Sequence, residues 1–252
     1  MSLFITKKTT RDLNIGIPEA ESESNFKASV KLKDVFEDFL GVTPKLEQEK
    51  FIVTGRKGSG KSAIGQTLLS KSKENANQFC CFIRKSDIDF EELVQFSKEN
   101  GHDISKESLF KWVILTKLLD LITQNQAVQN LKEIKTLKGF LDKNRGFVKI
   151  DRFEIKDLLK SSKFEISTER LLRIFKAGKN SKLDLNLQKA PFYKFIPHLE
   201  ELLVNILTSH EEIRNGNSYK LIFDDLDIEF KAEKEESVET LLNLIRISKR
   251  FN

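Results

Sequence analysis

The stretch FIVTGRKGSGKSAIGQTLL, residues 51–69, constrains the fold of this chain more than any other part of it. It matches the pattern G-x-x-x-x-G-K-[ST] through Gly55, Gly60, Lys61 and Ser62. An apolar run before the pattern is typical of a buried strand, and the apolar residues after it recur at helical spacing. Strand, glycine loop and helix in this order form the context in which such a loop binds phosphate.

The residue types in the loop suit a nucleoside triphosphate. Glycine permits backbone angles that other residues avoid, and backbone N–H groups at a helix start attract anions. Lys61 would reach the β- and γ-phosphates and assist catalysis, and the Ser62 hydroxyl would ligate Mg²⁺. The predicted nucleotide-binding residues are Gly55, Arg56, Lys57, Gly58, Ser59, Gly60, Lys61, Ser62 and Ala63. The alternative is an ordinary glycine turn between a strand and a helix.

A second motif, YKLIFDDLDIEF, lies near the other end of the chain, at residues 219–230. An apolar strand there ends in Asp224 and Asp225, with Asp227 just beyond. Carboxylates at the tip of a buried strand are costly unless they meet cations or water, and ligands bind at this edge of open α/β sheets. Asp224 is the candidate Mg²⁺ ligand, and Asp225 the candidate that orients or deprotonates an attacking water. The alternative is an acidic turn after a strand.

These segments predict an α/β fold, a P-loop parallel-sheet core with a long helical insertion. We expect strands over residues 51–53, 79–83 and 221–223, and helices over residues 26–40, 109–122 and 199–213. Residues 182–189 alternate apolar and polar types and predict a further strand. The expected division is a polar arm (1–25), the P-loop half of the core (26–84), a mainly helical insertion (85–217) and the second acidic strand with its helix (218–252).

Composition indicates the cellular compartment but does not identify the function. The chain has no apolar run near the about 18 residues of a membrane span and no signal-peptide pattern, so we expect a cytoplasmic protein without membrane contact. Its only cysteines, Cys80 and Cys81, are adjacent, which excludes a disulfide framework. Residues 101–200 hold 20 lysine and arginine residues against 12 acidic ones. This excess of positive charge could bind nucleic acid. However, no recognised nucleic-acid-binding motif accompanies it, and lysine-rich helix faces that are simply solvated are common.

The motifs GRKGSGKS and LIFDDLD together resemble the additional-strand branch of P-loop ATPases, and are most similar to its STAND and KAP-like groups and to related bacterial ATPases. The likeness covers residues 26–85 and 215–252. It implies ATP as the nucleotide, Asp225 as the hydrolytic carboxylate and, by analogy, a switch such as those of phage defence. That branch continues past the acidic strand with further strands, a sensor residue and an arginine finger, whereas this sequence ends at Asn252.

The sequence therefore predicts a Mg²⁺-dependent ATP-binding and ATP-hydrolysing switch. Because the core looks incomplete at its C-terminal side, we expect a longer chain, a protein partner or a second copy to complete the sheet. One alternative is a nucleotide-binding interaction module that has lost hydrolysis. A kinase that phosphorylates a small molecule is a further alternative, although no acceptor motif is present.

Overall fold

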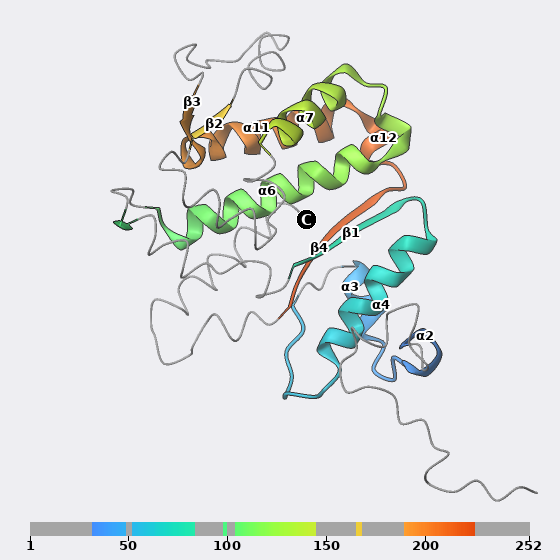
Figure 1. Ribbon diagram of the computed structural model, residues 1–252. Coiled ribbons are helices and arrows are strands. Elements are labelled where there is room, and N and C mark those ends of the chain that lie inside the picture. The colour runs from blue at the N-terminus through green and yellow to red at the C-terminus, as the bar shows by residue number, and fades with distance from the viewer. Residues whose placement is uncertain are drawn as a thin grey trace, which may run out of the picture. The chain divides into compact units, whose positions relative to one another are not determined.

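The computed structural model describes residues 32–48, 52–83, 98–99, 104–144, 165–167 and 189–224. The chain divides into two compact units, Met1–Asn75 and Ala76–Asn252, and each is described by itself. The predicted domain limits remain predictions. Figure 1 shows the helices and strands of both units in the colours of their sequence order.

The first unit contains three helices among its described residues: α2 (Leu32–Val35), α3 (Val42–Gln48) and α4 (Lys61–Glu74). The predicted helix over residues 26–40 is confirmed at Leu32–Val35 and wrong for residues 36–40, which leave the helix; residues 26–31 lie outside the described residues. The Asp38 carboxylate accepts hydrogen bonds from the backbone N–H groups of Val42 (2.8 Å) and Thr43 (2.7 Å). This caps α3, so a second helix begins where the sequence pattern suggested an end.

The second unit contains a two-stranded parallel sheet of β1 (Gln78–Ile83) and β4 (Ser218–Phe223). The two strands pair in register from Gln78 opposite Ser218 to Ile83 opposite Phe223. Both predicted strands are thereby confirmed, and the chain has a mixed helix and strand architecture with a parallel sheet. The two strands are far apart in the sequence, and β4 lies beside β1 in the sheet.

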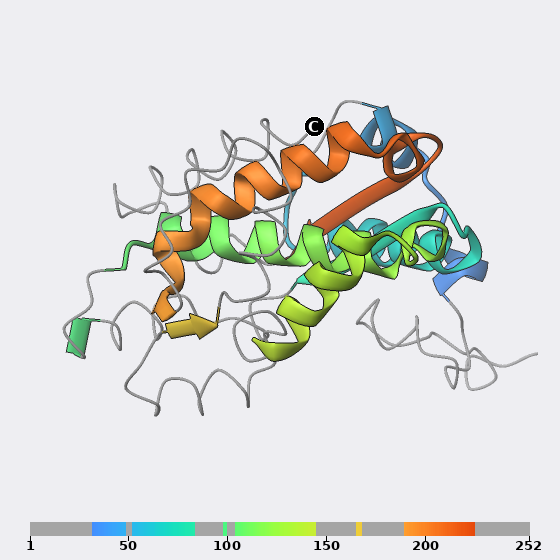
Figure 2. The ribbon, with the colours of Figure 1, turned by 90° about the horizontal axis from the view of Figure 1, so that it is seen from above.

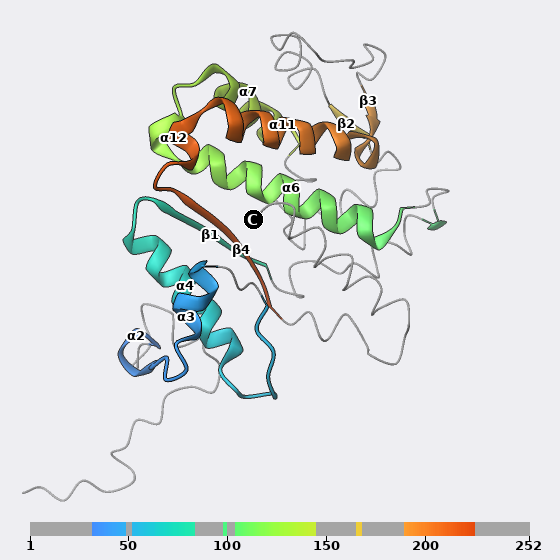
Figure 3. The same cartoon turned by 180° about the vertical axis from the view of Figure 1, so that it is seen from behind.

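The longest described helix, α6 (Lys106–Gln124), lies against this sheet in Figures 1 and 3. Its start is fixed by Ser105, whose hydroxyl accepts a hydrogen bond from the Ser108 N–H at 3.1 Å. The predicted helix over residues 109–122 is confirmed within it. Because α6 is apolar on nearly all sides, it can be buried between the sheet and other helices.

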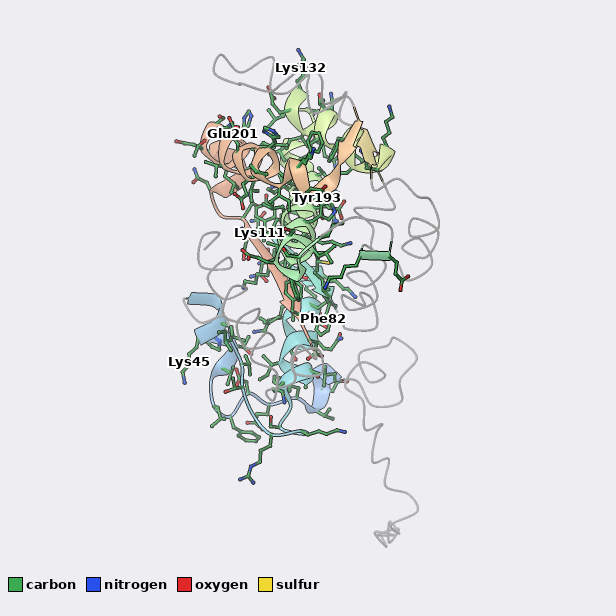
Figure 4. All side chains as sticks on the ribbon, turned by 90° about the vertical axis from the view of Figure 1, so that its left-hand side faces the viewer. Lys45, Phe82, Lys111, Lys132, Tyr193 and Glu201 are labelled. Carbon is green, nitrogen blue, oxygen red and sulfur yellow. The ribbon has the colours of Figure 1, made fainter. Side chains whose placement is uncertain are left out.

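Two further helices pack on α6: α7 (Lys132–Lys143) and α11 (Ile196–Ser209). Figure 2 shows them on either side of α6. The predicted helix over residues 199–213 is confirmed, although it is interrupted at His210 before the short helix α12 (Glu211–Arg214). The polar faces of both long helices point outward, as Lys132 and Glu201 show in Figure 4.

One hydrophobic core joins the sheet to these helices. Fully buried side chains in it include Phe110, Leu115, Leu119, Leu137, Phe140 and Leu199. The segment expected to be an insertion therefore packs directly on the strand that precedes Asp224. Short 3₁₀ helices connect the long ones, at η3 (Gln126–Val128) and η4 (Phe192–Phe195).

A small antiparallel sheet of β2 (Glu165–Ser167) and β3 (Lys189–Pro191) completes the described elements. Of the strand predicted over residues 182–189, only Lys189 lies within the described part of the chain, and it begins β3. Among the helices of the described residues, none combines the length and the apolar character that crossing a membrane requires.

Candidate functional site

The glycine loop leads directly into α4. Residues 52–56 form neither helix nor strand, and a turn closes where the Ser59 N–H donates to the Arg56 carbonyl at 3.1 Å. Gly58 and Gly60 have φ angles of 81° and 84°, a region that side-chain-bearing residues rarely adopt. Two of the loop's glycines are therefore needed for its shape.

The Lys61 side chain folds back over the loop. Its ammonium donates hydrogen bonds to the carbonyl oxygens of Gly55, at 2.9 Å, and Arg56, at 3.2 Å. Backbone carbonyls hold the charge in place without neutralising it. A cation fixed at the mouth of a glycine loop is suited to an anionic group there.

The start of α4 adds hydrogen-bond donors to the same place. The first bond within the helix runs from the Ile64 N–H to the Gly60 carbonyl, at 3.0 Å. The N–H groups of Lys61, Ser62 and Ala63 thus have no acceptor within the helix, and no side chain of the N-cap residue, Gly60, covers them. Together with the helix dipole they form a positive end that favours phosphate.

These residues fit a triphosphate with its magnesium ion. The positive-φ glycines open the backbone to a close approach, the helix start supplies donors, and Lys61 supplies charge. The Ser62 hydroxyl, next to Lys61 in the first turn, offers one oxygen to a hard cation. The structure thus places the nine predicted nucleotide-binding residues, 55–63, in one continuous loop and helix start.

The strand predicted over residues 51–53 is wrong for Ile52 and Val53, which adopt no regular structure; Phe51 lies outside the described residues. A strand exists only where another strand pairs with it, and the parallel sheet of the described residues consists of β1 and β4 alone. Half of the Ile52 side chain is exposed, at 50%. The apolar run therefore lacks the burial that its composition suggests.

Asp224 directly follows β4 and lies at the carboxyl end of the parallel sheet. Its backbone N–H donates to the Ile83 carbonyl at 2.9 Å, which extends the ladder between the strands by one bond. Asp224 is only partly buried. Asp225 and Asp227 lie outside the described residues, and within the described part of the chain no three His, Cys, Asp or Glu side chains form a cluster that could hold a metal ion.

The two faces of the sheet differ. Cys81 and Ile83 pack with the helical core, as do Tyr219, Leu221 and Phe223 of the other strand. Because strand side chains alternate, Cys80 and Phe82 point to the opposite face. Burial, with the neighbouring Cys81, raises the pKa of the Cys80 thiol to about 11. That thiol stays protonated at neutral pH and is no ready nucleophile.

The sequence pattern did not identify two side chains that support the acidic strand. Phe110 and Asn125, both from the helical segment, contact Phe223 and Tyr219 of β4. Local patterns carry no signal for such contacts, because they join residues about a hundred positions apart. Only the pairing of hydrophobic faces suggests them.

A scan against protein-family models and searches of curated proteins and of solved structures each found no match to this chain. We therefore base its function on the geometry of the glycine loop and of the acidic strand.

Proposed function

We propose that this chain binds Mg²⁺-ATP at its glycine loop and hydrolyses it, and that the nucleotide state acts as a switch. The observation that carries the proposal is the loop itself. Two positive-φ glycines, an ammonium held over the loop and the uncovered start of α4 converge within residues 55–63. An ordinary glycine turn needs neither the ammonium held over the loop nor the uncovered helix start.

Each predicted residue has a role in this proposal. The loop N–H groups and Lys61 bind the phosphates. Ser62 and Asp224 are each proposed as a magnesium ligand, and the ion would supply positive charge to the phosphates. Asp225 accepts a proton from water as the water oxygen bonds to the γ-phosphorus. The bond from that phosphorus to the bridging oxygen breaks, and ADP and phosphate leave.

The cytoplasm is the proposed compartment, because it supplies ATP and keeps Cys80 and Cys81 reduced. ATP rather than GTP follows from the likeness to additional-strand ATPases. That likeness also supports a regulatory role for the proposed switch.

Nucleotide binding is tested with Lys61→Ala. Loss of the ammonium should weaken ATP binding at least about 100-fold, because charge-assisted contacts to phosphate are lost. Isothermal titration calorimetry with Mg²⁺-ATP measures this. Lys73→Ala is the matched control, since Lys73 is an exposed lysine in the last turn of the same helix and should bind normally. Equal affinities for the two variants would contradict the proposal.

A second candidate is a nucleotide-binding module that does not hydrolyse. The lack of strand pairing between Ile52 or Val53 and the other described residues favours it, because hydrolysis requires a precisely held catalytic sheet. Phosphate release from the wild-type chain separates the two. Under the leading proposal, Asp225→Asn binds ATP with normal affinity and releases no phosphate above background. Release at the wild-type rate by that variant would remove Asp225 from its role.

A further inference from the structure

Helix α7 carries a row of lysines on the side that faces away from the core. Lys132, Lys135 and Lys138, which we call the lysine row, are all exposed, whereas the apolar residues between them are buried. Because residues three apart in an α-helix are slightly less than one turn apart, their side chains form one slanted line, with about 4.5 Å of helix axis between neighbours. Lys143, exposed in the last turn, extends the basic surface.

The charge of the lysine row is not balanced within the described part of the chain. None of its three ammonium groups forms an ion pair there. The Glu133 carboxylate of the same helix lies near His210 instead, with 3.9 Å between its Oε2 and the His210 Nε2. The other acidic residue of α7, Asp142, follows Lys138 by one turn, near the end of the helix. Three positive charges are therefore bordered by one carboxylate.

The two helices that flank α6 carry opposite charges. Helix α7 contains four lysines and two acidic residues, whereas α11 contains Glu200 and Glu201 and no lysine or arginine. Figure 2 shows these helices on either side of α6, and Lys132 and Glu201 point outward in Figure 4. A polyanion is therefore attracted to the surface of α7 and repelled by that of α11.

The charged side of α7 suits a nucleic acid better than a protein or a membrane. Every exposed residue of α7 is charged, and lysine is depleted at protein–protein interfaces, whose centres are apolar or aromatic. A helix that lies in a membrane surface inserts an apolar face, but the apolar side chains of α7, such as Phe140 at 0% exposure, lie in the core. A phosphate backbone requires only positive charges on a solvent-facing surface.

We propose that the lysine row of α7 binds the phosphate backbone of a nucleic acid without reading its sequence. A DNA duplex presents one negative charge about every 1.7 Å of its axis, so a row about 9 Å long meets phosphates in any register. Helix α7 contains no arginine, the residue that most often reads guanine. Each lysine that binds a phosphate releases a counterion, so binding weakens steeply as salt is added. This proposal does not depend on nucleotide binding at the glycine loop.

The test measures how binding depends on salt. The fluorescence anisotropy of a short labelled DNA duplex is followed as the full chain is added, without nucleotide, at KCl concentrations from about 50 to 200 mM. The triple variant Lys132→Ala, Lys135→Ala and Lys138→Ala should weaken binding at least about 10-fold at the lowest salt. It should also reduce the slope of log affinity against log salt by about 3, one for each lysine.

A matched control removes the same charge elsewhere. The triple variant Lys71→Ala, Lys73→Ala and Lys194→Ala loses three exposed lysines outside α7 and should keep the wild-type slope. An arginine at each position of the lysine row keeps the charge and should restore both affinity and slope. An unchanged slope in the first variant, or an equal reduction in the control, overturns the proposal.

Two further arms complete the test. If the alanine variant of the lysine row loses its far-UV circular dichroism, glutamine at the same three positions replaces alanine and must reduce the slope equally; an unchanged slope there overturns the proposal. The wild-type chain is also tested with single-stranded DNA, RNA and vesicles that contain phosphatidylserine. Binding to the vesicles but to none of the nucleic acids would identify the surface as a membrane contact, and the proposal would be wrong.

Discussion

The glycine loop carries the predicted phosphate-binding residues and the acidic strand carries the predicted acidic residues, and different forces hold the two segments. The loop is largely exposed, and its shape comes from neighbouring residues: a turn at Arg56–Ser59, two positive-φ glycines and a lysine bonded to its own loop. The strand β4 takes its place from residues about a hundred positions away, on β1 and α6. Substitutions in the loop should therefore weaken ATP binding with little effect on stability, whereas substitutions in the core around β4 should lower stability.

The difference also appears in the ionisable groups. In the first unit, N–H groups of Thr43 and Val42 lower the pKa of Asp38. In the second unit, burial raises the pKa values of Cys80 and Tyr219. Backbone hydrogen bonds are thus the main cause of the pKa shift at Asp38, and desolvation by burial is the main cause at Cys80 and Tyr219.

The largest effect should come from the core of the second unit. Phe140→Ala removes a ring with no exposed surface and should lower the free energy of unfolding by about 3–5 kcal/mol, through lost burial and the cavity left behind. Urea unfolding followed by the fluorescence of Trp112, the single tryptophan, measures this unit. Lys138→Ala, on the exposed side of the same helix, should change stability by less than about 0.5 kcal/mol. Similar losses for both variants would show that the core is not packed as described.

A smaller effect, confined to binding, should come from the loop. Gly60→Ala places a side chain at a φ of 84°, which costs about 1–2 kcal/mol. There is open space for its Cβ, so strain of the backbone is the only penalty. We expect ATP affinity to fall about 5- to 30-fold, measured by calorimetry, with the unfolding of the second unit unchanged.

Gly41→Ala is the matched control for this change. Gly41 has a φ of 58° and equally open space, but it lies in the turn before α3 and not in the loop. Its substitution should strain the backbone in a similar way and leave ATP affinity unchanged. If both variants bound ATP as the wild type does, the loop's conformation would not be the basis of binding.

The same contrast explains what could be predicted from the sequence. Helices α4, α6 and α11 and strands β1 and β4 follow from apolar periodicity, and the loop follows from its glycines, because these signals are local. The break in the first predicted helix has no local signal, since it depends on Asp38 reaching forward past Gly41 to cap α3. The strand prediction is wrong at Ile52 and Val53 because strand pairing, unlike apolar composition, is not a local property. Phe110 was unrecognised as a support of β4 for the same reason.

The smallest effect should come from Asp38, whose two carboxylate oxygens cap α3. Its pKa is lower in the folded chain than in the unfolded chain, mainly because of the Thr43 and Val42 N–H groups. The unfolded chain therefore binds the proton at higher pH, so the stabilisation is present above the unfolded pKa of about 4 and is lost as the pH falls through the folded value. Hydrogen exchange of the Val42 and Thr43 amides should show protection that declines below about pH 4 in the wild type. Asp38→Asn has one acceptor oxygen and no titration, so its protection should be lower at pH 7 and should not decline with acid. A wild-type decline matched by Asp38→Asn would mean that other carboxylates cause the pH dependence of α3. The stability of the first unit would then depend on more than contacts between neighbouring residues.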